Sequence, residues 1–220
     1  METHRPFVVH KVLSLVVIAT VACLVSNPDA RASRQQESLK EIARRHNGVA
    51  RMLVNVDAPF FSLEDLASKS DLIVQARIES ATSQLAVDEL SVITAYAFQP
   101  LHVLKDAVGA NASATPGPTV PMVFTMPGGK VLTEGLTISM TVKPEIDPPL
   151  RAGDEVIVFL RWNSAERTFQ QQYGDAGLLY VRGDRVVAAS KDYARLRPLA
   201  DDRLTAMIAE LQTMVKEGKK

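Results

Sequence analysis

Apolar residues recur at every second position in several short segments of the chain. This period of two is typical of β-strands with one face buried and the other exposed. Pro and Gly residues separate the segments and favour turns between them. The pattern predicts a mainly β fold with short antiparallel strands. The clearest sets are Leu72, Val74, Ala76 and Ile78; Val92, Thr94, Tyr96 and Phe98; Val120, Met122, Phe124 and Met126; and Leu136, Ile138, Met140 and Val142.

Further strands are expected after residue 150. Residues 156–160 are apolar on both faces, which is typical of an enclosed strand, and shorter strands follow at 169–173, 178–181 and 186–189. A two-residue Gly183-Asp184 turn predicts a hairpin, because Gly suits the first position of a type II′ turn. Pro100 cannot donate a ladder hydrogen bond and predicts a bulge or an edge. Together these signals predict one small antiparallel β-barrel with helices packed outside.

Helical signals lie at both ends of the strand region. Residues 201–220 carry an apolar stripe at helical spacing, with acidic residues first and lysines last. Ser62, followed by Glu64 and Asp65, predicts the start of a brief helix that ends near Lys69. Residues 33–46 are read as a short polar helix or a frayed arm.

Residues 1–32 have the pattern of a secretory signal peptide. Arg5 and Lys11 flank an uncharged apolar run at 12–25, which is shorter than the roughly 20 residues of a membrane-spanning helix. Small residues at Ala30 and Ala32 predict cleavage before Ser33 and export to the periplasm or the extracellular space. Retention as an N-terminal anchor and lipid attachment through Cys23 are the alternatives. The organisation expected is a signal peptide at 1–32, an N-terminal arm or short helix at 33–61, the barrel at 62–190 and a C-terminal helix at 191–220.

Charge and cysteine content exclude several function classes. The chain has 25 Lys+Arg and 25 Asp+Glu, which argues against a nucleic-acid partner. Its single cysteine, Cys23, lies in the signal, so the exported chain has no thiol for catalysis or for a disulfide. His46 and His102 match no metal-ligand spacing, and no G-x-S-x-G elbow is present. We expect no cofactor and no metal.

Four segments carry a resemblance to a loose group of secreted bacterial β-barrel domains, most of which have no assigned activity. They are DLIVQARI at 71–78, VLKD at 103–106, PGG at 127–129 and GDEVIVFL at 153–160. The same sequence pattern is more distantly similar to that of netrin-type modules and tissue inhibitors of metalloproteinases, which are OB-fold barrels. The resemblance covers roughly residues 62–190 and implies an OB-like barrel. Asp106 stands where the pattern has Gly. Those inhibitors chelate zinc with an N-terminal cysteine, which the exported chain lacks, so their mechanism is not implied.

Two sets of side chains are candidates for a site. Tyr96, Phe98 and Tyr173 could stack on a ligand, as aromatic residues on OB-fold faces do, or pack in the core. The carboxylates of a Pro-rich loop region, Glu145, Asp147, Asp154 and Glu155, are candidates for acid–base chemistry or for a solvated surface.

The function expected is an exported, non-enzymatic binding domain. Its partner would be a protein or a small ligand in the envelope or the extracellular space, with no nucleic acid and no membrane contact after signal cleavage. One alternative is a carboxylate-dependent hydrolase of cell-envelope material. Another is a structural subunit that docks through the C-terminal helix, which requires Met207 and Met214 to be exposed in the monomer.

Overall fold

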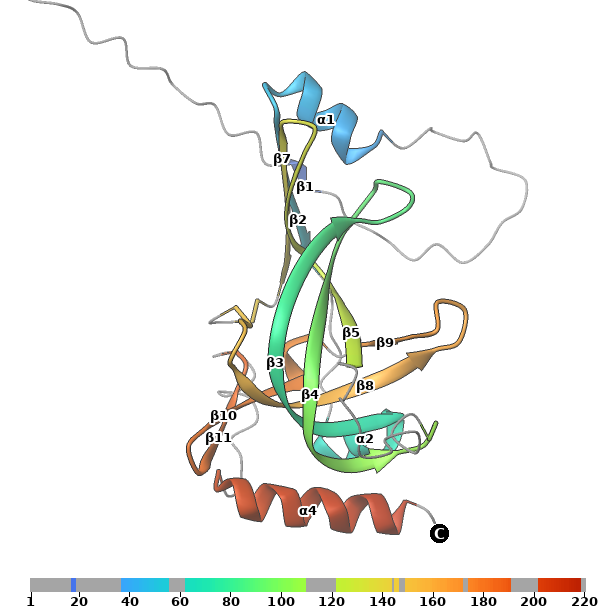
Figure 1. Cartoon of the computed structure of the whole chain (residues 1–220), viewed down its shortest axis with the longest axis vertical. Coiled ribbons are helices and arrows are strands. Elements are labelled where there is room, and N and C mark those ends of the chain that lie inside the picture. The colour runs from blue at the N-terminus through green and yellow to red at the C-terminus, as the bar shows by residue number, and fades with distance from the viewer. Residues whose placement is uncertain are drawn as a thin grey trace, which may run out of the picture.

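A computed structural model describes residues 17–18, 37–55, 62–109, 122–143, 145–146, 149–171, 174–190 and 202–218. The predicted cleavage site and Cys23 lie outside these residues. The fold is mainly β, as the alternating pattern predicts (Figure 1). No helix in the described ranges combines the length and the apolar character needed to cross a membrane.

The strands form two sheets. The four-stranded sheet has the order β1 (Val17–Ile18), β2 (Val49–Asn55), β7 (Leu136–Lys143) and β6 (Gly129–Thr133). The seven-stranded sheet has the order β11 (Arg185–Ala188), β10 (Leu178–Arg182), β8 (Glu155–Asn163), β3 (Leu72–Leu85), β4 (Val92–Asp106), β5 (Met122–Pro127) and β9 (Thr168–Gln170). A 3-10 helix, η1 (Gly174–Gly177), precedes β10.

Five strands of the larger sheet close on themselves. β8, β3, β4, β5 and β9 pair in turn, and β9 pairs again with β8. We call these five strands the ring. The ring confirms the small OB-like barrel. One pairing differs from a wholly antiparallel barrel, because β5 and β9 run parallel.

Local irregularities follow the sequence signals. The β3–β4 pairing shifts register where Ala76 faces Pro100, after Gln75 faces His102, so the bulge expected at Pro100 is present. The β10–β11 hairpin has the expected two-residue loop, and Gly183 has a φ of +66°. The Ser62 hydroxyl accepts from the Asp65 N–H and caps α2 (Leu63–Lys69).

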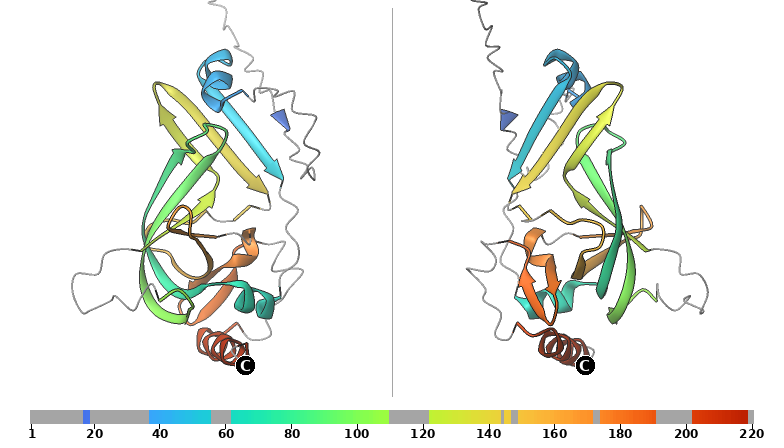
Figure 2. Two further views of the ribbon diagram at one scale, coloured as in Figure 1. Left: turned by 90° about the vertical axis from the view of Figure 1, so that its right-hand side faces the viewer. Right: turned by 60° about the vertical axis from the view of Figure 1, so that its left-hand side comes forward.

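Helix α4 (Leu204–Glu217) covers one side of the seven-stranded sheet together with α2 (Figure 2). Its apolar stripe packs against Ile73, Ile157 and Phe159 of the sheet. Met207 is 1% exposed, and Met214 packs against the same cluster. Subunit docking through this helix requires both methionines to be exposed in the monomer. That expectation is wrong for Met207, which is buried within the chain, and Met214 is partly buried.

The four-stranded sheet was not predicted as a separate layer. β2 comes from the expected N-terminal arm, yet it pairs in parallel with β7 over seven residue pairs. The Pro127-Gly128-Gly129 segment does not simply reverse the chain but carries it from β5 in one sheet into β6 in the other. Helix α1 (Leu39–Arg45) packs Leu39 and Ala43 against the inner face of this sheet.

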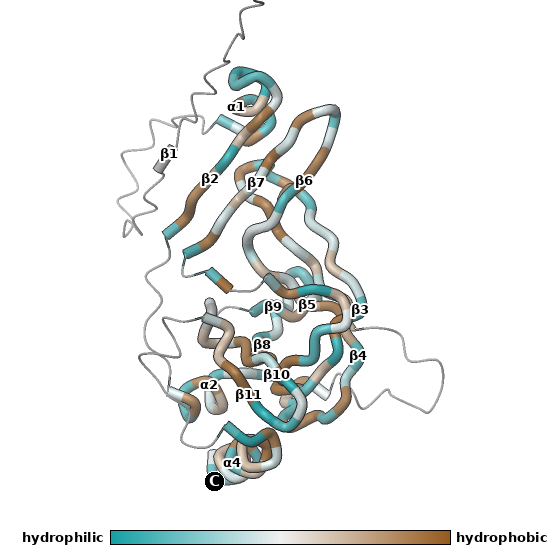
Figure 3. Tube along the Cα trace, turned by 90° about the vertical axis from the view of Figure 1, so that its left-hand side faces the viewer, coloured by the Kyte–Doolittle hydropathy of each residue, from teal (hydrophilic) through white to brown (hydrophobic). Residues whose placement is uncertain are grey.

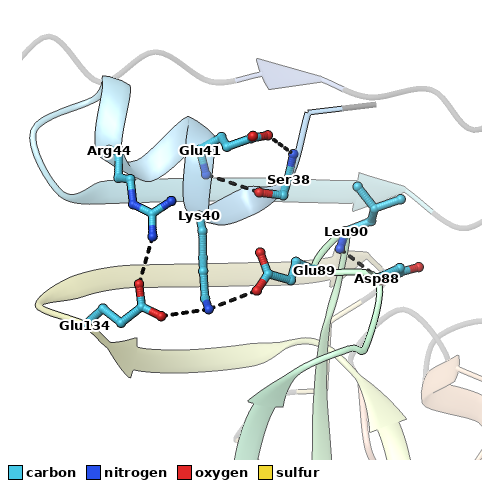
Figure 4. A network of polar contacts seen from close by, with 8 residues as sticks. All are labelled: Ser38, Lys40, Glu41, Arg44, Asp88, Glu89, Leu90 and Glu134. Carbon is cyan, nitrogen blue, oxygen red and sulfur yellow. Dashed lines mark hydrogen bonds and ion pairs between the residues drawn. The ribbon is translucent and has the colours of Figure 1, made fainter. Parts of the chain in front are cut away.

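A network of ion pairs fastens α1 to two hairpin tips (Figure 4). Lys40 Nζ lies 2.9 Å from Glu89 in the β3–β4 hairpin and 2.9 Å from Glu134 in the β6–β7 hairpin. Arg44 Nη2 lies 2.8 Å from the other oxygen of Glu134. The hydrogen bonds from Lys40 and Arg44 lower the pKa of Glu134, and those to Glu89 and Glu134 raise the pKa of Lys40.

Candidate functional site

A cavity of about 730 Å³ lies where one end of the ring meets the four-stranded sheet. Its volume falls in the range of about 300–1,000 Å³ that is typical of small-molecule sites. β4 and β5 form one wall and β7 forms another. Residues 145–146 and 149–150, together with Gly174 of η1, complete the cavity. Its apolar and aromatic lining includes Tyr96, Met126, Met140, Val142, Ile146 and Leu150.

The bend between β5 and β6 shapes the first wall. The Gly128 N–H donates to the carbonyl of Val92 at 2.7 Å, and the Thr94 hydroxyl donates to the carbonyl of Gly128 at 2.7 Å. These two bonds hold the bend against β4. Gly128 and Gly129 have φ values of +101° and +129°, a region in which glycine is strongly favoured. The sharp exit from the ring therefore depends on both glycines.

The second wall is a part of β7 that extends past its neighbour. Gly129, the first residue of β6, pairs with Met140. The last three residues of β7 therefore have no strand on that side. The Thr137 N–H donates to the carbonyl of Gly48 on the β2 side. With a period of two, the backbone groups of Val142 point to the opposite side. Among the described residues, this edge therefore has one N–H and one C=O that no neighbouring strand pairs with.

Tyr96 contributes the aromatic surface of the cavity. Its ring stacks on Phe124 with centroids 5.2 Å apart, and Phe124 in turn packs on Phe98 at 5.6 Å. Burial raises the pKa of the Tyr96 hydroxyl. That hydroxyl has no hydrogen bond within the described part of the chain and is a further polar group available to a ligand.

Charged side chains lie at the edge of the cavity. Lys143 Nζ lies 2.6 Å from Glu145 Oε2, so these two charges compensate each other. Lys130 also lines the cavity and is exposed, and it has no ion pair with any residue that the structure describes. The arrangement is an apolar space with a small excess of positive charge at its edge.

The structure separates the three predicted aromatic residues. Tyr96 lines the cavity, as a ligand-contacting residue must. Phe98 is 0% exposed inside the ring and cannot stack on a ligand, so it belongs to the core. Tyr173 lies outside the described residues. Met126 and Val142 were not predicted as site residues. The alternating pattern predicts that their side chains are buried, but it does not distinguish a packed core from the wall of a cavity.

The structure does not gather the predicted carboxylates into one described cluster. Asp154 accepts from the Arg151 N–H at 2.8 Å and from Arg182 at 3.0 Å, so it closes a turn. Glu155 accepts from the Gln75 side chain at 2.6 Å. Burial, and then the charge of Asp154, raise the pKa of Tyr180 far above its usual range.

Of the remaining acid candidates, Glu145 pairs with Lys143 at the cavity and Asp147 lies outside the described residues. The hydrolase hypothesis stays a prediction. Within the described ranges, no group of three or more His, Cys, Asp or Glu side chains is placed to hold a metal ion.

Comparison with known proteins adds no assignment to the cavity. No protein-family model matches the chain, and no curated protein matches it. The resemblance to secreted OB-like domains therefore stays a prediction from the quoted segments.

Proposed function

We propose that this chain is an exported binding domain that takes a small, largely apolar molecule into the cavity between the ring and the four-stranded sheet. The observation that carries the proposal is the composition of the cavity walls. Methionine, valine, isoleucine and leucine side chains surround a space of about 730 Å³, with Tyr96 providing an aromatic face. Apolar walls with a few polar groups are typical of small-molecule sites.

The polar groups in the cavity support a role in orienting the ligand. The Tyr96 hydroxyl and the backbone groups of Val142 lack partners among the described residues. Unpaired polar groups beside an apolar space gain from a ligand that hydrogen-bonds to them, because leaving them unpaired is unfavourable. The export part of the proposal rests on the signal-like residues 1–32.

A binding experiment on the full chain tests the proposal. N-phenyl-1-naphthylamine is a neutral apolar dye whose fluorescence rises when it leaves water, and we expect the protein to bind it saturably. A Val142→Trp substitution places a large side chain at the cavity wall and should weaken dye binding by about tenfold or more.

A matched control separates filling of the cavity from general damage. Val123→Trp makes the same change at a half-exposed valine of β5 that does not line the cavity. It should leave dye affinity unchanged. Equal loss in both variants, or no saturable binding by the original chain, would contradict the proposed function.

A further inference from the structure

One glutamine at the cavity wall is held in place by its backbone. Gln171 directly follows β9, and its N–H donates to the carbonyl of Thr125 in β5 at 3.0 Å. This bond continues the parallel pairing of β9 with β5 and places Gln171 beside Met126. Residues in register on neighbouring strands point to the same face of a sheet, so the Gln171 side chain shares the cavity face with Met126. Figure 3 shows β9 and β5 next to each other, below β7 and β6.

A second bond orients the amide group of this side chain. Gln171 Nε2 donates to the carbonyl of Gly174 in η1. A carbonyl oxygen can only accept, so this bond determines which end of the amide is the nitrogen and which is the oxygen. Gln171 Oε1 is therefore left as an acceptor, and no residue in the described part of the chain donates a hydrogen bond to it.

The unpaired oxygen keeps accessible surface although its residue is almost wholly buried. Gln171 is 3% exposed and lines the cavity. Among the described side chains, the unpaired polar atoms that are sealed from solvent are Ser70 Oγ and Gln75 Oε1, and Gln171 Oε1 is not one of them. An acceptor at a nearly buried position gains from a donor on a ligand, because leaving it unpaired is unfavourable.

The charges around the cavity favour an uncharged donor. Glu145 is the one acid among the described residues that line the cavity, and Lys143 Nζ lies 2.6 Å from it. An ammonium group beside Gln171 would be buried without a free carboxylate, which costs far more than burying a hydroxyl that is hydrogen-bonded. A carboxylate on the ligand would set its oxygens against Gln171 Oε1, acceptor against acceptor.

We infer that the ligand of the cavity is an apolar molecule with an uncharged hydroxyl or amide N–H group that donates to Gln171 Oε1. This inference rests on the proposed function and adds the class of ligand. The apolar body of the ligand lies among Met126, Val142 and Leu150, where water is displaced from apolar surface. Gln171 determines specificity, because a ligand without a donor leaves the glutamine oxygen unpaired.

Competition between two isomers tests the inference on the full chain. 1-Decanol and 1-methoxynonane contain the same atoms, but only the alcohol has an O–H to donate. Each is used to displace N-phenyl-1-naphthylamine, and we expect the alcohol to do so at a concentration about tenfold lower than the ether. Decylammonium, which also donates but is charged, should need a higher concentration than the alcohol.

Substitution of the glutamine provides the second measurement. Gln171→Met removes the acceptor and keeps the length of the side chain, so the ratio of the two concentrations should come close to one. Both isomers compete with the same dye on each variant, so a change in dye affinity cancels from the ratio. Gln84→Met makes the same change at an exposed glutamine of β3 that does not line the cavity, and it should leave the ratio as it was.

The outcomes separate the ligand class from the proposed function. Equal displacement by the two isomers, stronger displacement by decylammonium, or a ratio that Gln171→Met does not change overturns the inference. A ratio that falls in Tyr96→Phe but not in Gln171→Met would assign recognition to the Tyr96 hydroxyl and overturns it as well. The comparison of the isomers on the original chain decides the matter even if Gln171→Met does not fold. Absence of saturable dye binding overturns the proposed function instead.

Discussion

Lys40 Nζ lies 2.9 Å from Oε1 of Glu134, so an ammonium group on α1 binds the tip of the β6–β7 hairpin directly (Figure 4). The same nitrogen lies 2.9 Å from Glu89 at the tip of the β3–β4 hairpin. Glu89 and Glu134 have φ values of +57° and +50°, which are uncommon for residues other than glycine. The ion pairs stabilise two unfavourable backbone conformations by holding both tips against one helix.

The first prediction concerns pH. Hydrogen bonds from Lys40 and then Arg44 lower the pKa of Glu134, so its carboxylate stabilises the fold above the unfolded pKa of about 4.3. This stabilisation disappears as the pH falls through the lowered folded pKa. Hydrogen bonds to Glu89 and Glu134 raise the pKa of Lys40, so its contribution is complete below about pH 10.4 and disappears as the pH rises through the raised folded pKa.

Urea denaturation across this pH range measures the effect. The loss of unfolding free energy caused by Glu134→Gln should be greatest near neutral pH, disappear at strongly acidic pH and shrink at strongly alkaline pH. Glu79→Gln changes an exposed strand carboxylate that has no ion pair among the described residues, and it serves as the control. A loss that stays constant with pH would show that the ion pairs add no stability.

The second prediction separates the turn from the charge. Glu134 and Gly135 both have positive φ, as the two central residues of a type I′ hairpin turn do. Asn tolerates this conformation better than Gln does. Glu134→Asn and Glu134→Gln both remove the charge, so the Asn variant should unfold at the higher urea concentration. Equal midpoints would show that the turn conformation costs nothing at this position.

The third prediction concerns Gly129, where the chain passes from one sheet to the other. A Cβ atom at this position would collide with the hydroxyls of Thr94 and Ser83, which lie 2.8 Å from each other. Gly129→Ala should therefore lower the unfolding free energy by about 3 kcal/mol, from steric overlap and an unfavourable φ together.

Gly183→Ala is the matched control for the cost of placing alanine in a positive-φ backbone conformation. Gly183 has a positive φ as well, but open space surrounds the position that a Cβ would occupy. The expected loss is about 1–2 kcal/mol, from the backbone alone. If the two alanine variants lost the same unfolding free energy, steric overlap of the new Cβ with Thr94 and Ser83 would make no measurable contribution.

The parts of the fold that follow local signals were predictable from the sequence. The alternating strands, the Ser62 cap and the Gly183 hairpin each depend on residues a few positions apart. The four-stranded sheet depends on pairs such as Val49 with Thr137, which are far apart in the chain. A parallel pairing of that kind leaves no short-range pattern, so β6 and the role of β2 were missed.

The candidate site was only partly predictable for a related reason. Tyr96 and Phe98 lie on the same face of β4, two residues apart, so the alternating pattern predicts the same environment for both. The ring closes around Phe98 and leaves Tyr96 at its end, beside the cavity. The position of that end depends on where β5 bends away and where β6 begins. Neither boundary has a sequence signal that distinguishes one aromatic residue from the other.

The fourth prediction tests whether α4 belongs to the folded unit. Leu211 is 0% exposed within the cluster that joins α4 to the sheet. Leu211→Ala should lower the unfolding free energy by about 2–5 kcal/mol and leave the apparent mass on gel filtration unchanged. Gln212→Ala, at an exposed position of the same helix, should be close to neutral. A mass change without loss of stability would instead support docking through α4.

The fifth prediction separates a structural carboxylate from an acid–base residue. Asp154 bonds to the Arg151 N–H and to Arg182, and its side chain is 16% exposed. Asp154→Ala leaves both donors without this acceptor, so the unfolding free energy should fall by about 1–3 kcal/mol while dye binding in the cavity stays unchanged. Glu79→Ala controls for removal of a strand carboxylate without these bonds. The hydrolase hypothesis expects the opposite pair of results, in which stability is kept and turnover of envelope material is lost. Measuring unfolding and turnover on the same variant therefore decides whether this aspartate closes a turn or takes part in chemistry.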